Sequence, residues 1–220
     1  MSARRRADEA EQRREVVHVC HRLYARGLVA GQDGNVSVRL DDDRLLVTPA
    51  GWCKGDLRPE DLVVTDLRGN VMGEGRASSE LRMHLRIHAR RADVTAVVHA
   101  HPPIATGFAV AGETIAADVL PEIIFQVGEV ALVPFGLPGT PALADAMEPW
   151  LEGHDAFLLA NHGATTVGRS LRDALFRMEN LEHAACILLA ARQLGRVRTL
   201  APDAVRALRE AREAVRNDGG

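Results

Sequence analysis

The spacing of apolar positions along this chain predicts helices and short strands. Apolar residues recur every three or four positions over about 9–27, over 80–91 and from Ser170 onward, which is typical of helices with one buried face. Further helices are expected at 102–109, 139–151 and 202–216. Short apolar or alternating stretches predict strands at 36–40, 45–47, 61–66, 96–100, 130–133, 156–160 and 164–167.

Tight turns join two of these strand pairs, so the sheet is expected to be mixed or largely antiparallel. The turns are Asp41-Asp42-Asp43 and Asn161-His162-Gly163. Helices do not alternate regularly with strands, which indicates an α/β protein with helices packed on the faces of its sheet. A length of 220 residues without an internal repeat predicts one domain over residues 1–220.

Composition and charge narrow the class of protein. The chain is 46% hydrophobic and 26% charged with a formal net charge of −3, which gives no support to nucleic-acid or membrane-surface binding. No apolar stretch follows the charged N-terminus, and none is long enough to span a bilayer. Cys20, Cys53 and Cys186 are odd in number and far apart, which is typical of a reduced protein. We therefore expect a cytoplasmic protein.

Two histidines at the end of a strand are candidates for metal ligands. His99 and His101 are two residues apart, so both imidazoles are expected on the same face of the strand. Pro102 and Pro103 end the strand directly afterwards, which leaves the rings at an edge of the sheet. His162 follows another apolar strand in its Asn-His-Gly turn. If the two strands end together, three neutral imidazoles form the ligand set of a catalytic zinc ion with one open position.

Glu80 is the expected fourth member of this group. It follows Ser78 and Ser79 at the start of a helix, with Ser79 as the expected N-cap. The apolar face of that helix is expected to carry Leu81, Leu85 and Ala89. A carboxylate there could bind the metal or transfer a proton, although a glutamate in a first helical turn also fits a simple interaction with the helix dipole.

His84 and His88 form a rival pair, four residues apart on the same helix. Zinc proteases use such a pair in H-E-x-x-H, but here the residue after His84 is Leu85. Packing or support of neighbouring ligands is the favoured interpretation of this pair. The other histidines have no supporting neighbours and are interpreted as structural or surface residues: His18, His21, His154 and His183.

Three small-residue segments predict a phosphate pocket. They are Gly34-Asn35, Thr48-Pro49-Ala50-Gly51 and Ser78-Ser79, and Lys54 could add positive charge. Glycine allows backbone N–H groups to approach an anion closely, and the helix after Ser79 adds a favourable dipole. Neither a Walker loop nor a G-x-G-x-x-G run occurs, which disfavours a nucleotide ligand. Each segment alone would be interpreted as a plain turn.

Taken together, these motifs resemble the class II aldolase/adducin family, and within it the branch that cleaves L-fuculose 1-phosphate. The resemblance covers about residues 10–195. It rests on the order and spacing of Gly34-Asn35-Val36-Ser37, Thr48-Pro49-Ala50-Gly51, Ser78-Ser79-Glu80, His99-Ala100-His101 and Asn161-His162-Gly163.

The resemblance implies a fold, an assembly and a set of site residues. The fold is a three-layer α/β/α sandwich around a mostly antiparallel sheet, and the assembly is a homotetramer with active sites between subunits. One zinc ion per subunit would be bound by His99, His101 and His162, with Glu80 as the resting fourth ligand and catalytic acid/base. The residues that would bind the substrate phosphate are Asn35, Gly51, Ser78 and Ser79.

The implied activity is cleavage of a ketose 1-phosphate to dihydroxyacetone phosphate and a small aldehyde. Related epimerases have aspartate where this chain has Glu80, and adducins lack the three metal histidines. The aldolases also use a tyrosine from a neighbouring subunit, but none occurs between Val119 and Glu129, and Tyr24 is the only tyrosine. Epimerisation, dehydration or decarboxylation on the same zinc scaffold stays an alternative, as does a non-catalytic, adducin-like binding module.

Overall fold

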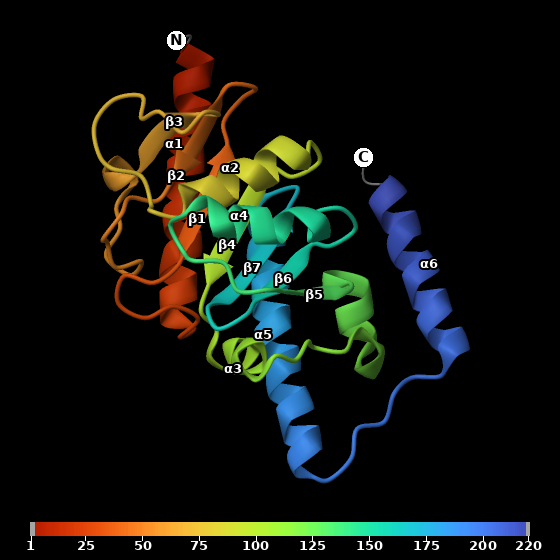
Figure 1. The fold of residues 1–220 in the computed structure, drawn as a ribbon. Coiled ribbons are helices and arrows are strands. Elements are labelled where there is room, and N and C mark those ends of the chain that lie inside the picture. The colour runs from red at the N-terminus through yellow and green to blue at the C-terminus, as the bar shows by residue number, and fades with distance from the viewer. Residues whose placement is uncertain (1–2, 219–220) are drawn as a thin grey trace.

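The computed structural model describes residues 3–218, and the side chains of residues 8–215. Its described residues form one seven-stranded sheet in the order β3-β2-β1-β4-β7-β6-β5 (Figure 1). The strands are β1 (Asn35–Arg39), β2 (Arg44–Val47), β3 (Val63–Asp66), β4 (Ala96–Ala100), β5 (Val130–Val133), β6 (Ala156–Leu159) and β7 (Gly163–Gly168). All neighbours are antiparallel except β5 and β6, which confirms the predicted mostly antiparallel sheet.

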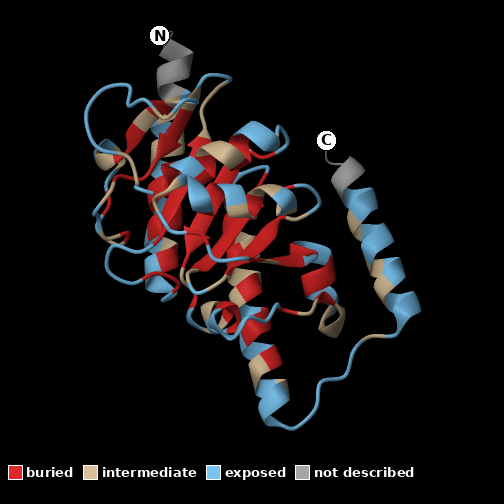
Figure 2. Cartoon of the chain, in the orientation of Figure 1, coloured by how far each residue is buried: buried red, intermediate tan, exposed pale blue. Residues whose placement is uncertain are grey.

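Helices cover both faces of this sheet, so the protein has the expected three α/β/α layers. On one face lie α1 (Ala3–Ala25), α3 (Pro103–Ala111) and α5 (Leu171–Gln193), and on the other lie α2 (Leu81–Arg90) and α4 (Pro141–Met147). The alternation of strand residues gives an apolar core on each face of the sheet, and a further small apolar cluster contains Leu45, Val47, Val63 and Leu81. Val98 packs with α1 and α5 in the first core, whereas its neighbour Val97 packs with α2 and α4 in the second. Figure 2 shows the sheet buried between the two layers.

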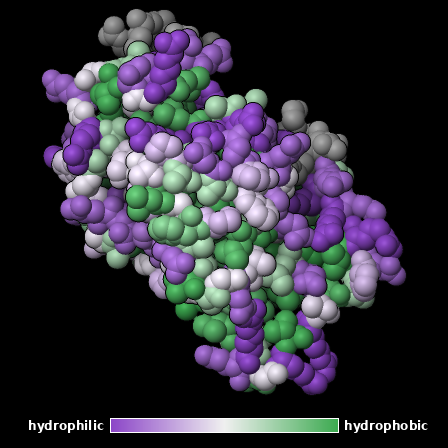
Figure 3. Space-filling model, viewed as in Figure 1, coloured by the Kyte–Doolittle hydropathy of each residue, from purple (hydrophilic) through white to green (hydrophobic). Residues whose placement is uncertain are grey.

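Short helical turns and a final helix complete the chain. The turns are η1 (Pro59–Asp61), η2 (Ala117–Val119), η3 (Ile123–Val127) and η4 (Glu148–Trp150), and the final helix is α6 (Pro202–Asp218). The outer surface of α6 is largely hydrophilic, whereas apolar side chains gather on the lower half of the same view (Figure 3). Within residues 3–218, every helix is too short or too polar to cross a bilayer.

The predicted elements agree with the structure except in two helices. The helix expected at 139–151 divides into α4 and η4, because Pro149 has no N–H to continue the α-helical hydrogen bonds. Ser79 is not the N-cap of α2: the cap position is Glu80, whose side chain makes no capping bond. Ser78 accepts the Glu80 N–H instead, at 3.3 Å.

The buried face of α2 also differs from the predicted one. Ala89 is exposed, and Met83, His84, Ile87 and His88 are buried together with Leu81. The apolar spacing failed here because two of the buried positions are histidines. Their partners are polar residues of β1, so this part of the core is polar.

Candidate active site

The three candidate metal ligands come from two neighbouring strand ends. His99 lies in β4 opposite Thr165 of β7, and His101 follows β4 directly. His162 lies in the turn between β6 and β7, where Asn161 takes a left-handed conformation with φ 55°. The strands β4 and β6 therefore end at the same edge of the sheet, as the sequence predicted, with β7 between them. Gly163 makes this approach possible, because a Cβ atom there would lie 2.5 Å from the ring of His101.

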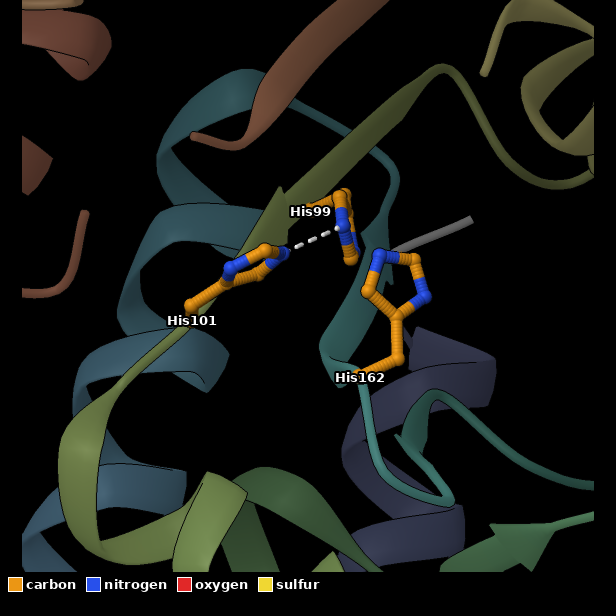
Figure 4. A group of neighbouring side chains, drawn as sticks. All are labelled: His99, His101 and His162. Carbon is orange, nitrogen blue, oxygen red and sulfur yellow. Dashed lines mark hydrogen bonds between the residues drawn. The ribbon is translucent and has the colours of Figure 1, made fainter. Parts of the chain in front are cut away.

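The three imidazoles surround one point in space (Figure 4). Their ring centroids are 4.8–5.1 Å apart. One nitrogen from each ring lies within 4.8 Å of the others, an arrangement consistent with a divalent metal site. His99 is fully buried, and His101 and His162 are half-buried.

Hydrogen bonds to the rings determine which nitrogens face that point. Nδ1 of His99 lies 2.9 Å from the carbonyl oxygen of Ala164, so it carries the proton and donates. Nδ1 of His101 lies 3.4 Å from a carboxylate oxygen of Asp33 and faces an acceptor in the same way. The two Nε2 atoms are then unprotonated and lie only 3.2 Å apart. Two lone pairs at that distance repel each other, and a bound cation would remove the repulsion.

The carboxylate of Glu80 joins this group. Oε2 lies 3.3 Å from Nε2 of His99, and Oε1 lies 3.2 Å from Nε2 of His162. Oε2 accepts a hydrogen bond of 2.8 Å from the amide of Asn35, whereas the buried Oε1 has no hydrogen-bond donor among the described residues. An anionic oxygen buried beside three imidazoles fits a fourth ligand of a divalent cation.

The pKa shifts agree with a metal-binding state of these groups. Burial lowers the pKa of His99 to about 3. Burial also lowers the pKa of His101, and the neighbouring His162 adds to the effect. Burial acts to raise the pKa of Glu80, but His99, His162 and the Asn35 hydrogen bond outweigh it and hold that pKa below its usual value. Neutral imidazoles and an ionised carboxylate are the forms that bind a metal.

A cleft of about 590 Å³ opens beside the histidines. Its lining includes every residue predicted to bind phosphate and all the predicted metal ligands except the buried His99: Asn35, Gly51, Ser78, Ser79, Glu80, His101 and His162. Backbone contacts hold two of the segments together, because Ala50 N donates to Arg76 O at 2.9 Å and Ser78 N donates to Thr48 O at 3.2 Å. Segments far apart in sequence thus share one cleft.

The cleft also contains charged residues that the sequence did not single out as site residues. Arg76 lines it, and its guanidinium has no hydrogen-bond or ion-pair partner among the residues that the structure describes. Asp33 lines it beside His101. The sequence contained only weak signals for these two residues. Arg76 lies two positions before the serine pair, and Asp33 directly precedes Gly34. Lys54 lines the same cleft but is almost fully buried.

The remaining candidates lie outside the cleft. His84 and His88 are buried behind it and are not members of the histidine triad. His18, His21 and His183 are exposed, and Nδ1 of His154 donates a hydrogen bond of 3.0 Å to the carbonyl oxygen of Trp150. Tyr24 is also exposed, packs near Gly55 and does not line the cleft of its own chain.

Known proteins share this sequence pattern and fold. Residues 14–189 match the family described as Class II Aldolase and Adducin N-terminal domain. The chain is 35% identical over 178 residues to a 3-oxo-tetronate 4-phosphate decarboxylase of Haemophilus influenzae, a match that covers 79% of this chain and 85% of that protein. It is 36% identical over 169 residues to an L-fuculose phosphate aldolase of Methanococcus maripaludis, covering 77% of this chain and 91% of that protein.

A solved structure extends the similarity to three dimensions. The crystal structure of YgbL from Escherichia coli matches with a TM-score of 0.86 at 30% identity, over 91% of this chain and 99% of that one. The segment that matches the family, residues 14–189, contains the histidine triad, Glu80 and the lining of the cleft. The chain therefore belongs to the class II aldolase and adducin family.

Proposed function

We propose that the protein is a zinc-dependent aldolase that cleaves a ketose 1-phosphate, such as L-fuculose 1-phosphate, to dihydroxyacetone phosphate and a small aldehyde. The observation that carries this proposal is the position of Glu80. Its carboxylate lies 3.3 Å from His99 and 3.2 Å from His162, and it also lines the cleft that contains the serine pair. The proposed proton-transfer group thus lies beside both the proposed cation site and the proposed anion pocket, which supports this function.

The histidine triad would bind one zinc ion per subunit. Nε2 atoms of His99, His101 and His162 would be its ligands, with Glu80 as the fourth when no substrate is bound. When bound, zinc would polarise the substrate carbonyl and stabilise negative charge on its oxygen. The sequence-based zinc prediction is supported by this donor set of three nitrogens and one carboxylate oxygen.

The phosphate of the substrate would lie against the three small-residue segments. Ser78 and Ser79 offer hydroxyl groups, Gly51 offers a backbone N–H, and Asn35 has a second amide N–H beyond the one given to Glu80. Arg76 would supply positive charge, because its guanidinium is not engaged elsewhere in the described chain.

Lys54 would add a second cation. Its Nζ donates to the carbonyl oxygens of Gln32 at 3.0 Å and Trp52 at 2.8 Å, which leaves one N–H for the cleft. Burial lowers the pKa of Lys54, so an anion in the cleft would favour its charged form.

Glu80 would transfer the proton in the step that follows bond cleavage. Breaking the C3–C4 bond of a ketose 1-phosphate leaves the enediolate of dihydroxyacetone phosphate, and C3 must then receive a proton. Glu80 lies beside the triad that would hold the carbonyl end of the substrate, so its carboxyl group would deliver that proton to C3.

Decarboxylation of a 3-oxo-tetronate 4-phosphate is the second candidate. Loss of C1 of this four-carbon acid as carbon dioxide leaves the same enediolate, so Glu80 and the triad would have the same roles. The leaving group differs, because an aldehyde forms only when a base removes a proton from the C4 hydroxyl, whereas carbon dioxide needs no such base. The lack of any tyrosine except the exposed Tyr24 favours this alternative.

The two reactions are separated by their second product. Zinc-loaded protein would be given a panel of ketose 1-phosphates and, separately, a 3-oxo-tetronate 4-phosphate, with a chelator control. A coupled reductase detects dihydroxyacetone phosphate from both, so aldehyde and carbon dioxide must be measured directly. Chelator-sensitive release of aldehyde supports the aldolase, and carbon dioxide supports the decarboxylase. Zinc binding without either product favours another reaction on this site, and absence of zinc binding favours an adducin-like binding module.

We also propose that the protein assembles as a homotetramer with the cleft near a subunit interface. Phe135 and Leu137 are 58% and 57% exposed, and they directly precede Pro138 and Gly139, which line the cleft. Exposed apolar side chains beside a polar cleft are typical of surfaces that bind another subunit. Light scattering should give a mass close to four chains.

A further inference from the structure

Four buried polar side chains form a line between β1 and α2. Asn35 and Ser37 are two residues apart on β1 and point to the face that α2 covers, and His84 and His88 are one turn apart on α2. Two strand residues and four helix residues both span about 6–7 Å, so the pairs match. All four residues are at most 5% exposed.

Short hydrogen bonds connect these side chains to Glu80. His84 Nε2 lies 2.5 Å from Asn35 Oδ1, and Asn35 Nδ2 donates to Glu80 Oε2 at 2.8 Å. On the other side of His84, its Nδ1 lies 2.7 Å from Ser37 Oγ. Ser37 Oγ is also 2.9 Å from His88 Nε2. These contacts form a hydrogen-bond chain that runs from His88 to the carboxylate beside the metal triad.

The chemistry of the groups determines which side chain donates and which accepts at each step of this hydrogen-bond chain. An ionised carboxylate only accepts, so Asn35 must present its amide N–H to Glu80 and its oxygen to His84. His84 then donates from Nε2 and accepts at Nδ1. Ser37 has a single hydroxyl proton, which goes to His84, and its oxygen accepts from His88 Nε2.

We propose that His84 is a positioning residue for Glu80, acting through Asn35, and that it leaves Glu80 Oε1 as the oxygen that transfers the proton. Oε2 is held by Asn35, whereas Oε1 has no hydrogen-bond donor in the described chain. The proposal rests on the proposed proton transfer by Glu80. It applies equally to the aldolase and to the decarboxylase, because both need that proton at the same carbon.

Burial keeps the positioning chain in one state. It lowers the pKa of His84 to about 3 and the pKa of His88 to about 4, so both rings are neutral at neutral pH. A neutral His84 has one donor and one acceptor nitrogen, as the chain requires. The rings of this hydrogen-bond chain therefore stay neutral while they orient the carboxylate.

Two matched substitutions of His84 test the donor and acceptor assignment of this hydrogen-bond chain. The amide nitrogen of glutamine reaches about the place of histidine Nε2, and that of asparagine reaches about the place of Nδ1. His84→Gln therefore keeps a donor for Asn35, whereas His84→Asn loses it. We expect His84→Asn to lower kcat about 10- to 100-fold with KM changed less than about twofold, and His84→Gln to stay within about threefold of the wild type.

The pair also separates positioning from packing, because both variants bury one amide in the same place. Thermal unfolding of both zinc-loaded proteins should show similar losses of stability. Equal losses of kcat in the two variants, or no loss in either, would overturn the proposal.

A second measurement needs neither a variant nor a substrate. Two-bond ¹H–¹⁵N correlation spectra of the zinc-loaded wild-type protein should show His84 and His88 as neutral Nε2–H tautomers. An Nδ1–H tautomer of His84 would overturn the proposal even if the enzyme is active. If neither candidate reaction occurs, the proposed function fails, and the spectrum still decides the arrangement of the chain.

Discussion

Asn35 lies directly opposite His99 in the register of β1 and β4. Nδ2 of Asn35 donates to Oε2 of Glu80 at 2.8 Å, and Nε2 of His99 lies 3.3 Å from the same carboxylate oxygen. Oε2 of Glu80 thus accepts a hydrogen bond from the amide of β1 and lies beside Nε2 of the β4 imidazole. The position of the proposed acid/base is set by the pairing of two strands in the middle of the sheet.

Replacing Glu80 by glutamine tests its role in proton transfer. We expect Glu80→Gln to lower kcat by about 10²–10⁴-fold, because the amide cannot exchange the proton that the enediolate needs. Circular dichroism should show an intact fold. The exposed Glu152 offers a control, and Glu152→Gln should keep full activity. A Glu80→Gln enzyme of nearly wild-type rate would exclude Glu80 from the chemistry.

Removing one imidazole of the triad should remove the metal. His99→Ala is expected to lose bound zinc and activity together, because two histidines and one carboxylate leave the site short of a ligand. Metal content after dialysis, measured by mass spectrometry, is the direct readout. The exposed His183 provides a matched variant, His183→Ala, that should keep one zinc ion per chain. A full equivalent of zinc in His99→Ala would contradict the ligand assignment.

Arg76 should contribute to affinity rather than to rate. Arg76→Gln is expected to raise KM about tenfold, equivalent to about 1.4 kcal/mol, while kcat changes little. The reason is that its guanidinium would contact the phosphate, which does not react. Arg68, which is exposed and does not line the cleft, serves as the control in Arg68→Gln. If KM is unchanged for Arg76→Gln, the phosphate lies elsewhere in the cleft.

Stability should fall as the pH is lowered below about 6.5. His84 and His88 have pKa values lowered to about 3 and about 4 in the folded protein, whereas the unfolded chain protonates them near 6.5. Between these values the unfolded state binds more protons, so each pH unit removes up to about 1.4 kcal/mol per group from the free energy of unfolding.

Urea unfolding at pH 7 and pH 5 would measure this fall. His88→Gln removes one of the two titrating groups, so its free energy of unfolding should depend less steeply on pH. An equal slope in this variant and in the wild type would show that His88 is not buried in its neutral form.

The sequence was sufficient to predict most of the fold and to predict which residues come together at the candidate site. The seven predicted strands and the predicted helices are present with shifts at their ends, except that the helix expected at 139–151 divides into α4 and η4, since apolar spacing reports burial on one face. His99, His101, His162 and Glu80 converge as predicted because each lies at or beside an end of an element whose position the spacing determined.

The rest depends on which residues face each other, and spacing along one element does not contain that information. His84 and His88 face inward because Asn35 and Ser37 lie opposite them, which placed Ala89 on the exposed side of α2. The extent of one domain, the tetramer and the identity of the metal stay predictions, because each concerns something beyond the contacts within this chain.

The polar line between β1 and α2 has a consequence for folding fidelity. A slip of β1 by two residues along β4 would leave apolar side chains on the correct faces, so apolar burial alone would hardly oppose it. The slip would, however, separate Asn35 and Ser37 from their partners and leave several buried polar groups unpaired, at about 1–3 kcal/mol each. The same contacts that orient Glu80 would thus reject a misaligned sheet, so molecules that complete folding would be molecules with an assembled site.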